Sequence, residues 1–217
     1  MTQRIPTTDP GDRTRGLAAA AAALRRGELV GLPLDTTYGL AADAFSERGV
    51  AALRAAKGRP GLSVPVMVPR VATVPGIARV TPAARALMEA FWPGALTLVL
   101  EAQPTLTWSV SERGRVAVRM PLHPVALELL ARTGPLGVVG AVPGAADPDA
   151  AFPPALAERL AVLLDAGPLE PGAASTVVDV TGAAPLLVRP GPIDPAELGS
   201  VCPELVVPQR PGQENAP

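Results

Sequence analysis

The chain has 217 residues, and its 19 basic side chains nearly balance 20 acidic ones, for a formal net charge of −1. With 48% apolar and 18% charged residues it can bury a substantial core, which excludes an intrinsically disordered chain. One histidine and one cysteine exclude a Cys/His zinc site and a disulfide framework. The near-neutral charge also argues against strong, mainly electrostatic binding of nucleic acid.

Capping residues, apolar runs and Pro-Gly breaks predict an alternation of helices and strands. Residues 1–12 are polar and rich in turn formers, so we expect a flexible N-terminal arm. In chain order the rest predicts a helix over 13–26, a strand over 28–33, Ala-rich helical sequence after Gly39, a helix capped by Ser46 and ending near 56, a strand over 64–68, a helix over 82–91, strands over 95–100 and 115–120, a helix over 124–132, a strand over 136–142, a loop over 143–154, a helix over 154–165, and strands over 175–180 and 186–189.

This alternation predicts one α/β domain over residues 13–206, built on a twisted mixed sheet with flanking helices. Residues 207–217 read as a disordered polar tail. The apolar run 17–24 is too short to cross a bilayer and is followed by charged residues without a cleavage site, so we interpret it as part of a buried helix. We therefore expect a cytoplasmic protein without a membrane partner.

A first candidate site is the polar cluster Asp35-Thr36-Thr37-Tyr38 at the end of the strand over 28–33. Hydroxyls and a carboxylate at a strand end commonly line a site in an α/β protein. A turn satisfied by its own side chains is an equally good interpretation.

A second candidate is Lys57-Gly58-Arg59-Pro60, which follows a predicted helix. Lys57 is the single lysine among 19 basic residues, which indicates a task that needs a compact ammonium group. Two cations separated by a glycine can face one polyanion, as phosphate chemistry requires. The alternative is a solvated helix C-terminus, where cations are favoured in any case.

Further candidate site residues lie at the ends of three later predicted strands. Ser175 opens one strand, and Arg189 with Pro190 and Gly191 ends the next. Arg119 ends the strand over 115–120 and is able to bind a carboxylate bidentately, with His123 shortly after it. Neither a Gly-x-Gly-x-x-Gly nor a Walker A sequence is present, so a dinucleotide fold or a P-loop is unsupported.

Six segments occur together in the order and spacing of the YrdC/Sua5 family, which the chain resembles from about residue 13 to 200. They are LPLDTTYGL at 32–40, KGRP at 57–60, FWPGALT at 91–97, VAVRMPLHP at 116–124, STVVD at 175–179 and RPG at 189–191. The resemblance implies a single YrdC-like domain, in which a twisted α/β sheet surrounds a large, concave, positively charged cavity.

The resemblance also implies a reaction: ATP, bicarbonate and L-threonine give threonylcarbamoyl-AMP and pyrophosphate for tRNA modification, with Mg²⁺ as cofactor. Lys57 and Arg59 would be catalytic and nucleotide-binding. The other implied site residues comprise Thr36, Tyr38, Arg119 and His123 for substrate, and Ser175 and Arg189 for nucleotide. We expect no metal ligand from the protein, small-molecule substrates, and an indirect link to tRNA-modifying partners.

The chain departs from the family pattern in three places. Where members usually carry Ser-x-Asn and a second serine, it has Gly140, Val142 and Gly144. Leu34 and Ser63 likewise replace a usual threonine and lysine. Two alternatives therefore stay open: a divergent enzyme that makes a carbamoyl adenylate of another amine in specialised metabolism, and a non-catalytic module that binds nucleotide or RNA.

Overall fold

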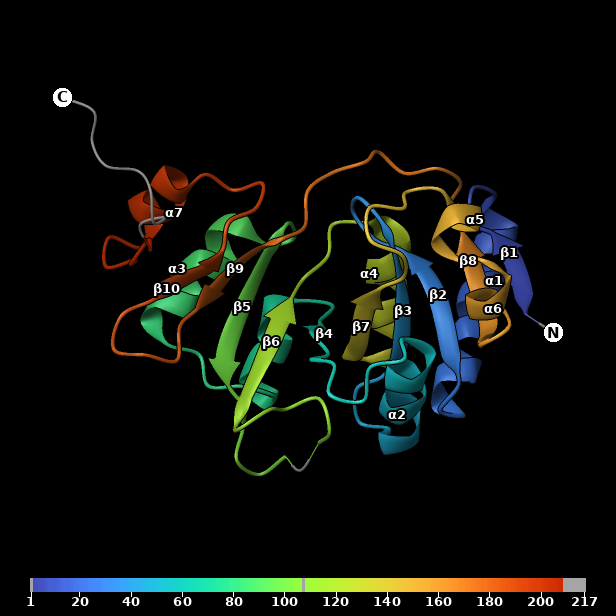
Figure 1. Cartoon of the computed structure of the whole chain (residues 1–217), viewed down its shortest axis with the longest axis horizontal. Coiled ribbons are helices and arrows are strands. Elements are labelled where there is room, and N and C mark those ends of the chain that lie inside the picture. The colour runs from blue at the N-terminus through green and yellow to red at the C-terminus, as the bar shows by residue number, and fades with distance from the viewer. Residues whose placement is uncertain (1, 107, 209–217) are drawn as a thin grey trace.

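The protein is built on one large mixed β-sheet (Figure 1). The computed structural model describes residues 2–106 and 108–208. In these residues ten strands follow the order β1-β8-β2-β3-β7-β4-β6-β5-β9-β10. The strands are β1 Gln3–Pro6, β2 Leu29–Pro33, β3 Tyr38–Asp43, β4 Val66–Met67, β5 Leu96–Glu101, β6 Arg115–Arg119, β7 Leu136–Gly140, β8 Leu160–Asp165, β9 Thr176–Asp179 and β10 Leu186–Arg189. The α/β fold predicted from the sequence is confirmed.

Helices connect most of the strands. They are α1 Pro10–Arg25, α2 Glu47–Ala56, the 3₁₀ helix η1 Val71–Gly76, α3 Pro82–Phe91, α4 Pro124–Thr133, α5 Pro148–Ala151, α6 Pro154–Ala157 and α7 Pro195–Val201. Ser46 caps α2 as predicted, because its hydroxyl accepts a hydrogen bond from the Gly49 N–H. Within the described residues no helix has the length and apolarity needed to cross a membrane.

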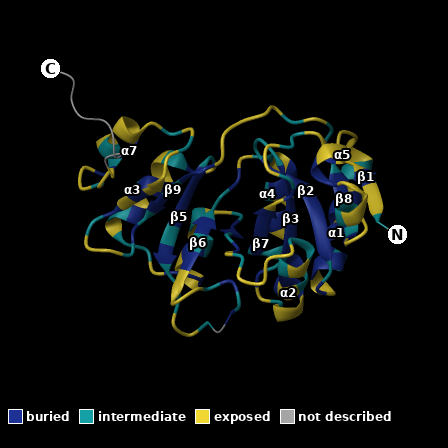
Figure 2. Ribbon diagram, in the orientation of Figure 1, coloured by how far each residue is buried: buried dark blue, intermediate teal, exposed yellow. Residues whose placement is uncertain are grey.

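The short strand β4 joins two parts of the sheet, which we call the five-strand half (β1, β8, β2, β3, β7) and the four-strand half (β6, β5, β9, β10). Helices cover both faces of the five-strand half. Val30 and Leu32 belong to the core under α1 and α4, whereas Leu40 and Ala42 belong to the core that includes α2. Figure 2 accordingly shows the inner strands of this half as buried.

The four-strand half is covered differently. Leu96, Leu98 and Leu100 of β5 are buried in the core to which α3 contributes, and α7 packs on α3. Side chains alternate along a strand, so Thr97 and Val99 face the opposite side of the sheet. Both line cavities there. The four-strand half therefore offers one open face for a site.

The N-terminal residues correct one expectation. Residues 3–6, expected within a flexible arm, form β1, which pairs in parallel with β8. Ile5 is 2% exposed and lies against Gly16 of α1, where an added Cβ would be 3.0 Å from the Ile5 side chain. A four-residue strand is too short to leave a periodic pattern in the sequence. Residues 209–217 of the expected tail lie outside the described residues.

Two predicted helical segments are wrong. The segment 154–165 contains only the short helix α6, followed by β8, which lies between β1 and β2. The run Leu-Ala-Val-Leu-Leu at 160–164 is continuously apolar, and such a run fits a buried parallel strand as well as a buried helix. The Ala-rich sequence after Gly39 is likewise part of a strand, β3, paired with β2 and β7.

Tyr38 opens β3 and is fully buried. Its hydroxyl donates to the Gly167 carbonyl at 2.7 Å and accepts from the Ala166 N–H at 3.0 Å. Its ring meets the edge of Phe152 with the centroids 6.0 Å apart. Burial raises the pKa of Tyr38 to about 12. The side chain thus fixes the segment that leaves β8.

We predict that Ile5→Ala lowers the free energy of unfolding by about 2–4 kcal/mol, because it leaves a cavity between β1 and α1. Urea denaturation measures this, with Gln3→Ala, an exposed neighbour on the same strand, as the control. Equal stability of the two variants would contradict an ordered N-terminal strand.

We predict that Tyr38→Phe lowers the free energy of unfolding by about 1–3 kcal/mol, because two backbone groups lose their partner. The same denaturation experiment measures it. An unchanged stability together with weakened substrate binding would instead assign the hydroxyl to the substrate, as the family resemblance implies.

Candidate active site

A cavity of about 500 Å³, here called the main cavity, lies between the two halves of the sheet. Its walls come from the β2–β3 turn, the loop after α2, the end of β7 and the segment before β9, with side chains of β5 and β6. Six of the eight residues predicted from the sequence line it: Thr36, Lys57, Arg59, Arg119, Ser175 and Arg189.

The loop after α2 brings Lys57 to the cavity wall. Gly58 has φ +61°, a left-handed conformation that turns the chain directly after Lys57. The Lys57 Nζ donates to the Gly140 carbonyl at 3.0 Å and also to the Ala141 carbonyl. Burial, and repulsion from Arg59, lower the pKa of the Lys57 ammonium from its usual value. Because Lys57 and Arg59 both line the main cavity, both are able to act on one anion there.

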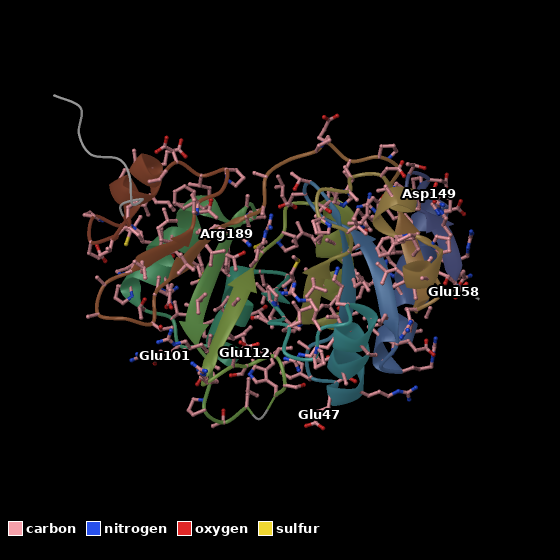
Figure 3. All side chains as sticks on the ribbon, viewed as in Figure 1. Glu47, Glu101, Glu112, Asp149, Glu158 and Arg189 are labelled. Carbon is pink, nitrogen blue, oxygen red and sulfur yellow. The ribbon has the colours of Figure 1, made fainter. Side chains whose placement is uncertain are left out.

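A hydrogen-bonded cluster forms the opposite wall. The hydroxyls of Ser175 and Thr97 lie 2.9 Å apart. Arg189 donates from Nη2 to the Ser175 hydroxyl and from Nε to the Ser175 carbonyl, both at 2.9 Å. At Gly191 an added Cβ would lie 2.4 Å from the Thr176 nitrogen, so only glycine permits this close approach of the two segments. Figure 3 labels Arg189, the last residue of β10, on the four-strand half of the sheet.

Arg119 reaches the cavity from the end of β6 and pairs with Asp35 of the β2–β3 turn. Its Nε donates to the Gly94 carbonyl at 2.9 Å. The second Asp35 oxygen accepts the N–H groups of Leu122 and His123 at 2.7 and 3.1 Å. Both charged side chains are largely buried, at 14% and 12% exposed. Arg119 is therefore held rigidly at the cavity wall.

The β2–β3 turn supplies two threonines. Thr36 lies against Gly172, where an added Cβ would be 2.4 Å from the Thr36 methyl group. The Thr37 hydroxyl donates to the Ala145 carbonyl at 2.9 Å. Thr37 and Thr97 also line the cavity; neither had been given a specific role, although Thr37 belongs to the first candidate cluster. For Thr37 the signal was its place in the polar cluster, whereas Thr97 carries no local signal beyond its strand position.

Two predicted site residues do not line the main cavity. Tyr38 points toward Ala166 and Gly167, as described above. His123 is half-buried and caps α4, where its Nδ1 accepts the Val125 N–H at 3.3 Å. Burial lowers the pKa of the His123 imidazole from its usual value.

The residues that depart from the family pattern form a largely apolar part of the wall. Leu34, Gly140, Val142 and Gly144 all line the main cavity, as does Ser63. At Gly140 an added Cβ would meet nothing within 4 Å. The wall therefore has free space where a side chain could point into the cavity.

The lining of the main cavity includes four cationic side chains, and among the described lining residues there is no carboxylate. Asp35 lies behind Arg119 and offsets one of these charges. Such a lining favours a polyanionic ligand.

Comparisons with known proteins identify the family and the fold. The sequence model of the Sua5/YciO/YrdC family, described as "Telomere recombination", matches residues 22–191. A putative threonylcarbamoyl-AMP synthase of Mycobacterium tuberculosis is 44% identical over 209 residues, which cover 93% of this chain and 95% of that protein. The threonylcarbamoyl-AMP synthase of Bacillus subtilis is 37% identical, over 93% of this chain and 59% of that protein.

A solved structure of Pyrococcus abyssi Sua5 complexed with L-threonine superposes with a TM-score of 0.78 at 30% identity. The match covers 95% of this chain, which spans 62% of that longer protein. Escherichia coli YciO shares the fold, with a TM-score of 0.77 at 22% identity over 89% of this chain and 97% of that one. The family match over most of the chain confirms the resemblance noted in the sequence, and the protein belongs to the Sua5/YciO/YrdC family.

Proposed function

We propose that the protein converts ATP, bicarbonate and L-threonine into threonylcarbamoyl-AMP and pyrophosphate. The observation that carries this proposal is the main cavity itself, which is lined by Lys57, Arg59 and Arg189 and by five hydroxyl side chains, with no carboxylate among its described lining residues. The names of the relatives from M. tuberculosis and B. subtilis, and the threonine complex of the P. abyssi protein, support the choice of substrates.

The reaction needs positive charge beside the leaving pyrophosphate. Bicarbonate takes up a proton and loses water to give carbon dioxide; the threonine amine bonds to its carbon and loses a proton, which leaves a carbamate. A carbamate oxygen then forms a bond to the α-phosphorus while the bond from that phosphorus to the leaving pyrophosphate breaks. Negative charge grows on the pyrophosphate, and Lys57 with Arg59 stabilises it. Burial, and to a lesser degree repulsion from Arg59, lower the pKa of Lys57, and a bound anion would favour the charged ammonium again.

The remaining wall residues bind and orient the reactants. Arg119, fixed by Asp35, faces the amino-acid carboxylate, and Thr36 lies on the same side. Ser175 and Arg189 hold the nucleotide. Tyr38 and His123 support the site indirectly, Tyr38 through the segment after β8 and His123 through its backbone contact to Asp35.

A magnesium ion fits this site only as part of the nucleotide complex. Among the described residues no cluster of three or more His, Cys, Asp or Glu is present. Mg²⁺ in phosphate chemistry is commonly bound by one or two carboxylates besides the phosphates and water. No carboxylate is among the described lining residues of the main cavity, so phosphate oxygens and water would hold the ion there. When bound, the ion would neutralise charge on the polyphosphate.

We place the protein in the cytoplasm, where its product would pass to partners that modify tRNA. The near-neutral charge of the chain favours such a small-molecule role over direct binding of RNA phosphates.

The direct test is an assay of pyrophosphate release with ATP, bicarbonate and Mg²⁺ over a panel of amino acids, with the adduct identified by mass spectrometry. We expect release that depends on threonine and an adduct with the mass of threonylcarbamoyl-AMP. Release with a different amine and not with threonine would contradict the proposal.

Arg59→Ala should reduce threonine-dependent pyrophosphate release by about 100-fold or more, because it removes a charge that stabilises the leaving group. Since Arg59 is exposed, the free energy of unfolding should change by less than about 0.5 kcal/mol. Arg132→Ala, an exposed arginine on α4, is the control and should keep full activity. An Arg59→Ala enzyme with half the activity or more would refute its catalytic role.

Gly140→Ser should lower the KM for ATP about fivefold, because one added hydrogen bond contributes about 1 kcal/mol and the cavity has space for the hydroxyl. Gly137→Ser, on the same strand, is the contrasting control: its Cβ would lie 2.8 Å from the Val64 side chain, so it should destabilise the fold instead. A higher KM for the Gly140 variant would show that the wall is adapted to its open space.

A further inference from the structure

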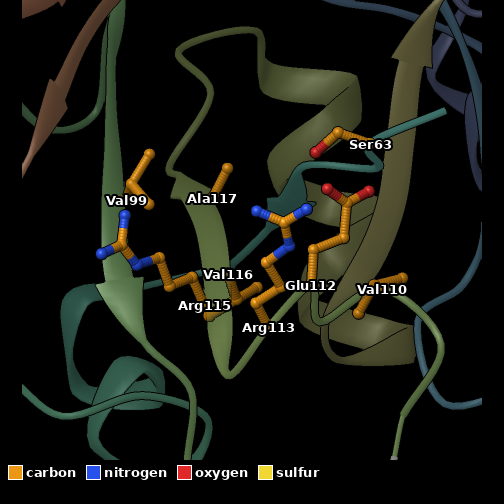
Figure 4. Close-up of a pocket in the computed structure, with 8 residues that line it drawn as sticks. All are labelled: Ser63, Val99, Val110, Glu112, Arg113, Arg115, Val116 and Ala117. Carbon is orange, nitrogen blue, oxygen red and sulfur yellow. The ribbon is translucent and has the colours of Figure 1, made fainter. Parts of the chain in front are cut away.

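A second cavity, here called the side cavity, has a volume of about 650 Å³ (Figure 4). Ser63 lines both this cavity and the main one, so the two adjoin at the loop that carries Lys57 and Arg59. Nothing in the reaction described above uses the charged side chains of the side cavity.

Three charged residues line the side cavity: Glu112, Arg113 and Arg115. Arg115 pairs with Asp179 at 3.1 Å, so its charge is partly offset. Among the ion pairs of the described residues, neither Glu112 nor Arg113 takes part in one. Figure 4 shows the Arg113 guanidinium and the Glu112 carboxylate extending toward the segment that carries Ser63.

The backbone at Arg113 is strained. Arg113 has φ +51° and Gly114 has φ +75°, while Glu112 and Arg115 exchange two backbone hydrogen bonds of 2.9 Å. This is the pattern of a tight hairpin turn, in which Asn, Asp or Gly is favoured at the first central position. An arginine there costs stability, and strain of this kind is concentrated at functional sites.

The walls of the side cavity are held together by Arg54 of α2. Its Nε donates to the Leu62 carbonyl at 3.0 Å and its Nη2 to the Ser109 carbonyl at 2.8 Å. Leu62 precedes Ser63, and Ser109 precedes Val110, so Arg54 links two segments that each supply a lining residue to the cavity. The side cavity is thus a built extension of the main cavity.

We propose that the side cavity binds the pyrophosphate end of the nucleotide, and the pyrophosphate released from it, as a magnesium complex. Arg113 contacts the phosphate oxygens, and Glu112 provides the carboxylate for the accompanying Mg²⁺. A carboxylate beside a guanidinium would repel a bare polyanion, whereas a metal–pyrophosphate complex presents charges of both signs. The inference rests on the proposed function, which supplies pyrophosphate as the product next to Lys57 and Arg59.

Calorimetric titration of the full chain with sodium pyrophosphate, with and without Mg²⁺, tests the proposal. Arg113→Asn should weaken pyrophosphate binding about tenfold or more under both conditions. Glu112→Gln should weaken it only when Mg²⁺ is present. Arg132→Asn is the control, because Arg132 is an exposed arginine of α4 that lines neither cavity. This variant should bind pyrophosphate as the unchanged protein does.

Thermal unfolding separates binding from folding in the same variants. Arg113→Asn should unfold at the same or a higher temperature, because asparagine favours the left-handed conformation. A variant that is more stable and yet binds pyrophosphate less tightly assigns the strained arginine to the ligand. Unchanged pyrophosphate affinity in Arg113→Asn would overturn the proposal, and so would weakened AMP binding with unchanged pyrophosphate binding, which would assign the cavity to the nucleoside.

The two proposals fail in different ways. A chain that binds pyrophosphate through Arg113 but releases none from ATP with threonine would refute the proposed function and leave this site standing. A chain that synthesises threonylcarbamoyl-AMP while Arg113→Asn binds pyrophosphate normally would refute this site alone.

Discussion

The buried ion pair between Asp35 and Arg119 joins the two halves of the sheet at the point where the main cavity opens. Few strand pairings otherwise connect the two halves, because β4 pairs only two residues with β6 and two with β7. Asp35 comes from the five-strand half and Arg119 from the four-strand half, and the same carboxylate binds two backbone N–H groups after β6. Breaking such a buried pair typically costs about 3–5 kcal/mol, so the cavity and the fold depend on it together.

Elsewhere around the joint, main-chain carbonyls hold the cationic side chains. Lys57 crosses from the loop after α2 to the end of β7, and Arg54 crosses to the loop between β5 and β6. Carbonyl oxygens accept these hydrogen bonds without neutralising the charge. The positive potential of the site is therefore kept for a ligand, while burial and repulsion from Arg59 lower the pKa of Lys57.

The sequence predicted those features of the fold that are determined by neighbouring residues in the chain. The Ser46 cap, the cationic turn at Gly58 and the strands of the four-strand half follow from capping, glycine conformation and alternation. The direction of Tyr38 does not, because it depends on which face of β3 meets the segment after β8. The strand β8 was mistaken for a helix because its apolar run carries no period, and its identity is fixed only by its neighbours β1 and β2.

The departures from the family pattern are easier to understand from the main-chain contacts. Lys57 is anchored by the carbonyls of Gly140 and Ala141, and a carbonyl is present whatever side chain the residue carries. The wall at Gly140, Val142 and Gly144 can therefore lose polar side chains without releasing the lysine. What such a change alters is the space and hydrogen bonding offered to the ligand. The main-chain carbonyls at the end of β7 thus set the position of Lys57, whereas the side chains there set the selectivity of the cavity wall. The side chains are therefore able to change while the position of Lys57 is kept.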